Sequence, residues 1–131
     1  MGVEDWLPTL LELTGTGRDT PKGNDGISLA RRLLGRQSRD RPFLYRETPA
    51  YGGQQCVRVG DWKLVRKNLN AGPQDPHPQV TELYHLAKDP RETADLAGQY
   101  QDIVDKLLAV AKSQRTRSSL WPIIGLDSAS E

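Results

Sequence analysis

The chain has 131 residues, which is enough for one domain with a modest hydrophobic core. Its 18 lysine and arginine residues nearly balance 17 aspartate and glutamate residues, so the formal net charge is +1. This balance excludes a general electrostatic attraction to nucleic acid or to anionic membranes. The single cysteine, Cys56, excludes an intramolecular disulfide.

The sequence shows no targeting signal. No apolar run is long enough to cross a bilayer, and the N-terminus lacks the basic and apolar regions of a secretory signal. The localisation is therefore unknown from the sequence, and neither a membrane nor nucleic acid is expected as a partner.

The first predicted element is a short helix between Asp5 and Gly15. Pro8 is tolerated in a first helical turn, and Gly15 is suited to end the helix. Large apolar side chains nearly encircle this helix, which predicts burial on more than one side. These side chains are Trp6, Leu7, Leu10, Leu11 and Leu13.

Residues 16–26 are polar and glycine-rich, so they are predicted to form an exposed connection. Gly15 and Gly17 lack the preceding strand and the spacing of a nucleotide-binding loop, and no phosphate site is predicted there. A second short helix is predicted at residues 27–34. The basic segment 36–41 is then a solvated linker rather than a nucleic-acid site.

Residues 43–48 are rich in aromatic and β-favouring side chains and predict a strand. A hairpin follows, because Gly60-Asp61 is suited to a two-residue turn between two runs of alternating apolar and polar residues. That turn aligns four cross-strand pairs. The pairs are Val59 with Trp62, Arg58 with Lys63, Val57 with Leu64, and Cys56 with Val65.

The like-charged pair of Arg58 and Lys63 is unfavourable unless an anionic group lies nearby. A carboxylate of a neighbouring strand could supply it, and Glu47 and Glu82 are available. The alternative is an anionic substrate that reaches this face. Structural ion pairs are the simpler interpretation.

Residues 68–79 contain prolines and glycines and predict a long loop, followed by a fourth strand at residues 80–86. His77 and His85 lack cysteine or carboxylate neighbours at ligand spacing, so no zinc site is predicted. Residues 91–97 can form a helical turn.

The clearest helical pattern runs from Tyr100 to Lys112, where apolar residues recur at spacings of three and four. After the polar segment 113–119, the apolar tail 120–124 is expected to pack back on the sheet or to dock on a neighbour. Together these elements predict an α+β fold. It has a small antiparallel sheet of about four strands packed against a C-terminal amphipathic helix, with one or two N-terminal helices.

Several segments carry a family resemblance in a fixed order. Residues 5–11 read Asp-x-x-Pro-Thr-Leu-Leu, and residues 25–29 read Asp-Gly-x-Ser-Leu. Strand-like segments follow at 44–47 and 55–65, and residues 82–97 contain Glu-Leu-Tyr-His-Leu and Asp-Pro-Arg-Glu. In this order they resemble the C-terminal part of the sulfatases, sulfate-ester hydrolases of the alkaline-phosphatase-like superfamily.

The resemblance implies that residues 1–35 are a helical remnant from the end of a sulfatase catalytic domain. Residues 36–131 would then be a C-terminal subdomain of antiparallel sheet plus helix, which braces the catalytic domain and lends loops to the rim of the substrate site. The rim candidates are Arg46, Glu47, Tyr51, Gln54 and Lys63. Arg46 replaces an aromatic residue of the family pattern and His85 replaces an aspartate, so no substrate preference carries over.

The resemblance places the catalytic groups outside this chain. The family's nucleophile is a formylglycine made from the first residue of a Cys or Ser, x, Pro, x, Arg motif, and its calcium ligands belong to the catalytic domain. Cys56 does not begin that motif, because Arg58 and Gly60 stand at the proline and arginine positions. We therefore expect no catalytic residue, no metal site and no cofactor in this chain, and no activity from it alone.

Two kinds of partner follow from these expectations. One is a sulfatase catalytic domain, and the other is a second copy of the chain, bound through the apolar face of the N-terminal helix around Trp6, Leu10 and Leu13. The alternative function is that of a stand-alone interaction or scaffold module derived from a sulfatase C-terminus.

Overall fold

The computed structural model describes residues 2–16, 22–37 and 41–127, which form parts of two compact units, Met1–Arg41 and Pro42–Glu131. No helix within these described ranges is long and apolar enough to span a membrane. Gly17 and parts of the predicted connection and basic linker lie outside the described residues.

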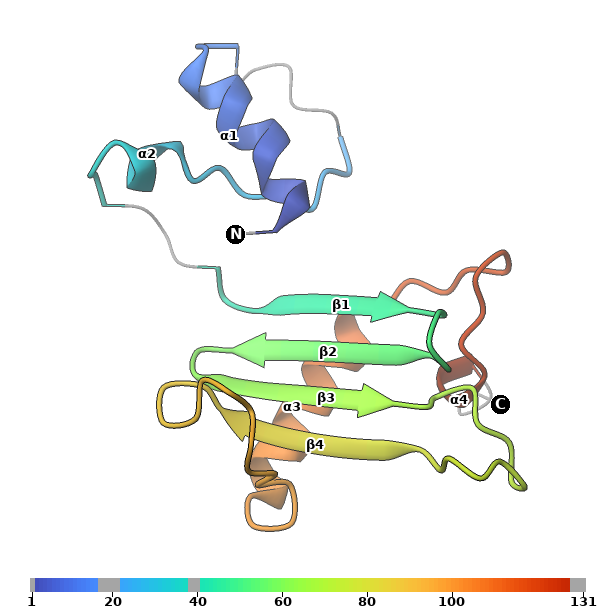
Figure 1. Ribbon diagram of the computed structural model, residues 1–131. Helices are drawn as coiled ribbons and strands as arrows, with labels where there is room; N and C mark the ends of the chain where they lie inside the picture. Colours follow the sequence, from blue (N-terminus) through green and yellow to red (C-terminus); the bar gives the residue numbers. More distant parts are fainter. Residues whose placement is uncertain (1, 17–21, 38–40, 128–131) are drawn as a thin grey trace. The chain divides into compact units, whose positions relative to one another are not determined.

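The first unit contains the 3-10 helix η1 (Val3–Asp5), helix α1 (Trp6–Leu13) and helix α2 (Ala30–Leu33) (Figure 1). Helix α1 matches the predicted N-terminal helix, and Gly15 ends it with a φ of +78°, a conformation that glycine adopts readily. The predicted burial of its apolar residues is wrong for four of the five. Trp6, Leu7, Leu10 and Leu13 are each about half exposed, because Pro8 and Thr9 form the buried side of the helix.

Two buried polar side chains of the first unit hold residues 26–29 against α1. The Asp5 carboxylate accepts hydrogen bonds from the Gly2 amide at 2.7 Å and the Ile27 amide at 3.0 Å, and it also pairs with Arg41. Thr9 Oγ1 donates to the Asp5 carbonyl oxygen at 2.5 Å and accepts the Leu29 amide at 3.0 Å. Because side chains take these amides, residues 27–29 are not helical, and α2 is shorter than predicted.

The second unit is a four-stranded antiparallel sheet with sequential order β1 (Leu44–Thr48), β2 (Gln54–Val59), β3 (Trp62–Lys67) and β4 (Val80–His85). Helices α3 (Gln101–Gln114) and α4 (Ile124–Asp127) follow (Figure 1). The α+β class, the four strands and the C-terminal helix are as predicted. The β2–β3 register also reproduces the four predicted pairs, and Gly60 adopts a φ of +57° in the turn.

The core lies between one face of the sheet and α3. Strand side chains of Val57, Leu64 and Leu83 pack against the apolar stripe of α3, which includes Val104 and Leu107. This stripe is the one predicted from the helical spacing. Burial of these side chains is the main stabilising contribution to the second unit.

The segment between β4 and α3 differs from the prediction. No helical turn forms at residues 91–97, which lie in turns, a bend and irregular backbone. The Asp89 carboxylate accepts the amides of Thr93 and Ala94 at 2.7 and 2.9 Å, and the Asp95 carboxylate accepts the amide of Ala97 at 2.9 Å. These aspartates compete for the amides that a helix would use.

The apolar tail packs back on its own unit. Ile123 is buried, the Ile124 amide donates to Asn70 Oδ1 at 2.9 Å, and the Gly125 amide donates to the Leu69 carbonyl oxygen at 2.7 Å. Leu120 and Trp121 remain largely exposed. The first of the two predicted arrangements therefore applies to the end of the tail.

Candidate docking face and substrate rim

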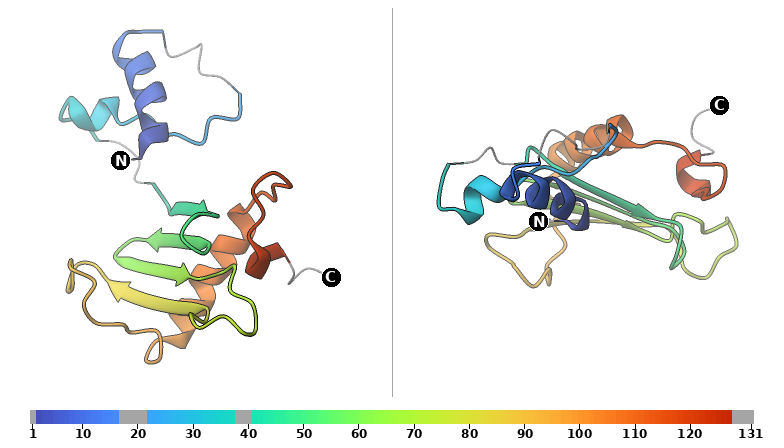
Figure 2. Two further views of the ribbon diagram at one scale, coloured as in Figure 1. Left: turned by 45° about the vertical axis from the view of Figure 1, so that its right-hand side comes forward. Right: turned by 90° about the horizontal axis from the view of Figure 1, so that it is seen from above.

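The two faces of the sheet differ in what covers them. Helix α3 lies along one face, and part of the segment between β4 and α3 lies on the other side (Figure 2). Because side chains alternate along a strand, the face opposite α3 carries a distinct set of residues. This set, called the open face here, consists of Leu44, Arg46, Thr48, Gln54, Cys56, Arg58, Lys63, Val65, Lys67, Val80, Glu82 and Tyr84.

A pocket of about 250 Å³ lies at the β1–β2 end of the open face. It is lined by Arg46, Glu47, Gln54, Cys56 and Val65, together with Thr48 and Gln55. The structure thus brings three of the five predicted rim residues, Arg46, Glu47 and Gln54, to one place. Arg46 gives this pocket a cationic side chain, and Val65 gives it an apolar wall.

Lys63 lies on the open face but outside this pocket. Its Nζ atom is 2.6 and 2.8 Å from the two carboxylate oxygens of Glu92, so the like-charged pair with Arg58 is relieved by a carboxylate. The prediction that Glu47 or Glu82 supplies this carboxylate is therefore wrong. Glu82 pairs with Lys67 at 2.6 Å, and Glu47 projects from the other face of the sheet.

Tyr51 stands on the turn between β1 and β2 with 84% of its surface exposed and a φ of +53°. The turn is held by the backbone of the loop after β3, because Gly52 and Gly53 carbonyl oxygens accept the amides of Asn70 and Leu69 at 2.8 and 3.0 Å. A non-glycine residue with positive φ and an exposed aromatic ring is a feature that often accompanies a binding role.

Cys56 is unsuited to nucleophilic catalysis. Burial raises the pKa of its thiol, and the nearby charges of Lys63 and Arg46 oppose that effect only in part. Since the thiolate is the reactive form, a raised pKa keeps the group unreactive at neutral pH.

The described residues also do not fit a calcium or zinc site, because they contain no cluster of three or more His, Cys, Asp or Glu side chains. His77 lies 3.8 Å from Asp75, and the ring of His85 packs edge-on against Trp62 with centroids 4.7 Å apart. Both histidines thus have local contacts within the second unit.

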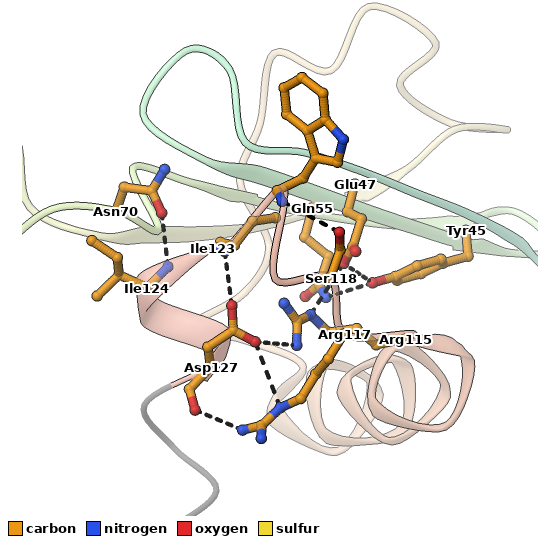
Figure 3. Close-up of polar contacts among 11 residues, drawn as sticks. Tyr45, Glu47, Gln55, Asn70, Arg115, Arg117, Ser118, Ile123, Ile124 and Asp127 are labelled. Carbon is orange, nitrogen blue, oxygen red and sulfur yellow. Dashed lines mark hydrogen bonds and ion pairs between the residues drawn. The ribbon is translucent and has the colours of Figure 1, made fainter.

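A polar cluster on the α3 side of the sheet was missed by the sequence analysis (Figure 3). Arg115 has only 9% of its side chain exposed, and it contacts Asp127 at 2.7 Å and Glu47 at 3.3 Å. Tyr45 donates a hydrogen bond to Glu47 and accepts one from Gln55 at 3.1 Å. Burial and the bond to Glu47 raise the pKa of Tyr45 to about 12.

This cluster changes the interpretation of Glu47, one of the rim candidates. Its carboxylate is engaged by Tyr45 and Arg115 on the face that α3 covers, although its stem borders the open-face pocket. Arg115 belongs to the polar, basic segment 113–119. The composition of such a segment predicts exposure to solvent and does not show that one of its arginines is buried.

No family model matches the chain. N-acetylgalactosamine-6-sulfatase of Canis lupus familiaris is 23% identical over 140 residues, which cover 86% of this chain and 26% of that protein. The chain thus spans about a quarter of the length of this relative.

Solved structures give the same result. A Bacteroides thetaiotaomicron protein assigned to the sulfatases is 27% identical, with a TM-score of 0.63 over 83% of this chain and 23% of its own. A protein solved in complex with its substrate D-glucosamine-2-N,6-O-disulfate is 22% identical, with a TM-score of 0.64 over 83% of this chain and 22% of its own. This chain is therefore related to the sulfatases, as its ordered motifs indicate, and it corresponds to about a quarter of such a protein.

Proposed function

We propose that this chain acts as the C-terminal subdomain of a sulfatase, where it braces the catalytic domain and contributes to the rim of the substrate site. The observation that carries the proposal is the open face of the sheet. Helix α3 completes a core on one face only, while the pocket at Arg46 and Cys56 leaves part of the other face available. A unit with its own core and one open face is suited to docking against a larger domain.

The rim role rests on charge and exposure at one end of the sheet. Arg46 and Gln54 line the open-face pocket, and Tyr51 presents an exposed ring on the adjoining turn. One relative is named for a sulfated amino sugar and another was solved with one bound. A cationic side chain beside an aromatic ring suits such a substrate, since sulfate groups attract arginine and sugar rings pack on aromatic faces.

We also propose that the chain by itself does not catalyse hydrolysis of a sulfate ester. Cleavage of a sulfate ester needs an activated nucleophile, positive charge on the sulfate oxygens and an acid for the leaving alcohol. Cys56 lies outside the formylglycine motif and has a raised pKa. The formylglycine and the calcium ion would belong to the catalytic domain.

A chimera tests this proposal. Residues 42–127 replace the matching region of the relative that was solved with D-glucosamine-2-N,6-O-disulfate, and hydrolysis of that sugar is measured. We expect the chimera to turn over substrate faster than the same relative with the region deleted, and the 131-residue chain alone to show no turnover. Equal rates for chimera and deletion, or turnover by the chain alone, would contradict the proposal.

The rim role is tested in the same chimera. Arg46→Glu is expected to raise KM more than tenfold, because it reverses the charge beside an anionic substrate. The matched control is Lys106→Glu, since Lys106 is an exposed cation on α3 with one exposed partner, Asp102, at 3.7 Å. If both substitutions raise KM equally, the assignment of Arg46 to the substrate rim is wrong.

Self-association is a second candidate role, favoured by the exposure of α1. Trp6, Leu10 and Leu13 are 53%, 50% and 45% exposed, so the helix presents apolar surface that a second copy could cover. Sedimentation velocity at increasing protein concentration tests this role. Leu10→Gln should raise the dissociation constant of the dimer at least tenfold, whereas Leu120→Gln, in the exposed tail, should leave it unchanged. If the chain is a monomer at every concentration at which it is soluble, this role is rejected.

A further inference from the structure

A second pocket, of about 440 Å³, lies on the α3 side of the sheet, opposite the open face. It is formed where the C-terminal end of α3 and the returning tail meet residues of β2 and β3. Its volume is within the range of pockets that hold small molecules, roughly 300–1,000 Å³. Among the residues that line it are the cations Arg66, Lys112, Arg115 and Arg117 and the apolar residues Leu108 and Leu126.

Two of these four cations have carboxylate partners. Arg115 contacts Asp127 and Glu47, and Arg117 lies 3.6 Å from the same Asp127 carboxylate and donates to the Asp127 carbonyl oxygen at 2.6 Å (Figure 3). Arg115 Nε makes no well-formed hydrogen bond within the described residues, although it is buried. This half of the pocket is therefore close to electrically balanced.

The other two cations are not balanced. Arg66 donates one hydrogen bond, from Nη1 to Gln55 Oε1 at 3.3 Å, and Lys112 is exposed at the mouth of the pocket. Neither forms an ion pair with a carboxylate of the described residues. Burial lowers the pKa of Arg66, which reflects the cost of holding a guanidinium away from water without a carboxylate partner.

The wall beside these cations is apolar. Leu108 and Ala111 come from α3, and Leu126 comes from α4. A pocket with surplus positive charge at one side and an aliphatic wall at the other is complementary to a molecule with one anionic group and an apolar body. Arginine binds carboxylate and sulfate oxygens through two parallel N–H groups, so Arg66 suits a planar or tetrahedral oxyanion.

We propose that this pocket binds a small organic anion, whose carboxylate, sulfate or sulfonate group lies on Arg66 and Lys112 and whose apolar body lies along Leu108, Ala111 and Leu126. The site is on the opposite side of the sheet from the proposed docking face. It therefore does not depend on the proposed sulfatase role, and either proposal can fail without the other.

Isothermal titration calorimetry of the full 131-residue chain tests this site with three probes. Naphthalene-2-sulfonate has both the anion and the apolar body, inorganic sulfate has only the anion, and 2-naphthalenemethanol has only the apolar body. We expect 1:1 binding of the sulfonate at least tenfold tighter than binding of either other probe. Equal binding of the sulfonate and the neutral alcohol, or no binding of the sulfonate, would overturn the proposal.

Substitutions locate the site. Arg66→Gln should weaken sulfonate binding at least tenfold, and Lys112→Gln should weaken it about threefold. Arg58→Gln is the matched control, because Arg58 is an exposed arginine of β2 on the open face, and it should change binding less than twofold. Lys112 is exposed, so Lys112→Gln tests the site even if Arg66→Gln disturbs the fold. If Arg58→Gln weakens sulfonate binding as much as Lys112→Gln does, the assignment of the site is overturned.

Discussion

Replacing the buried Asp5 by asparagine is expected to release residues 26–29 from helix α1. The carboxylate is the common acceptor for the Gly2 amide, the Ile27 amide and the Arg41 guanidinium. Asparagine keeps the size of the side chain but offers one oxygen, and it turns the other position into a donor. Oδ1 of the carboxylate accepts from both Ile27 and Arg41, and Oδ2 accepts from Gly2, so at least one donor faces an N–H group in either orientation of the amide. Every bond that remains, including that of Ile27, loses the negative charge of its acceptor.

The magnitude follows from the charge on the acceptor. A hydrogen bond to a charged group contributes about 1.5–3 kcal/mol, and a buried donor without an acceptor costs about 1–3 kcal/mol. We therefore expect Asp5→Asn to lower the free energy of local opening by about 2–3 kcal/mol. At about 1.4 kcal/mol for each factor of ten, the Ile27 amide should exchange with solvent ~30- to ~140-fold faster.

Hydrogen exchange measured by NMR at the Ile27 and Leu29 amides is the assay. Asp25→Asn is the matched control, because Asp25 is an exposed aspartate of the same segment, and exchange in that variant should stay within about twofold of the unchanged chain. If Ile27 exchanges in the unchanged chain as fast as an unfolded peptide, or equally fast in both variants, the Asp5 anchor does not hold this segment.

The same anchor has a defined pH dependence. Burial of Asp5 raises the pKa of its carboxyl group, but hydrogen bonds from the Gly2 and Ile27 amides and the charge of Arg41 outweigh burial and lower the pKa below its ordinary value. A lowered pKa means that the anchor stabilises the first unit above about pH 4 and is lost as the pH falls below that value.

Three further outcomes are expected from the second unit. Leu83→Ala, at a fully buried position of the edge strand β4, should lower the free energy of unfolding measured in urea by about 2–5 kcal/mol, and a loss below about 1 kcal/mol would contradict the assigned core. Cys56 should react with a disulfide reagent more slowly than free cysteine at pH 8, because burial raises its pKa; equal rates would show an open thiol. Tyr45 should ionise near pH 12, so its contribution to stability is lost as the pH rises from about 10 towards 12. Tyr45→Phe should reduce the late step of the tyrosinate absorbance by about half, because the pKa of Tyr84 is also raised to about 12.

The sheet and its register could be predicted because the signals are local. A period-2 pattern on each side of Gly60-Asp61 fixes which residues of β2 and β3 face one another, and the structure has those pairs. The helical spacing between Tyr100 and Lys112 likewise identifies the side of α3 that contacts the core.

The errors concern contacts between residues far apart in the chain. Helix α2 is short because Asp5 and Thr9 bind amides some 20 residues away. The carboxylate beside Lys63 comes from Glu92, which lies outside the strands and adopts a φ of +55°. The buried Arg115 depends on Glu47 and Asp127 together. Neither periodicity nor composition contains this information.

The residues that carry the family resemblance have structural roles here, which limits what the motifs say about chemistry. Asp5 and Thr9 hold the Asp-Gly-x-Ser-Leu segment, and a Cβ atom on Gly26 would lie 1.9 Å from the Glu4 carbonyl oxygen. Asp89 orders the turn after β4. We therefore expect substitutions at these positions to lower the stability of the fold rather than to alter substrate preference.

Under the proposed rim role, a substrate preference would come from exposed positions of the second unit. Arg46, within the 44–47 segment, and Tyr51, on the turn that follows it, lie near one end of the sheet and outside the hydrophobic core. Because exposed positions tolerate substitution with little loss of stability, they can vary while the fold is kept. Exchange of Arg46 and Tyr51 alone for the matching residues of a sulfatase of known substrate, in the chimera described above, should alter KM and leave the unfolding free energy within about 1 kcal/mol, whereas exchange of residues 25–29 should alter stability and leave KM unchanged.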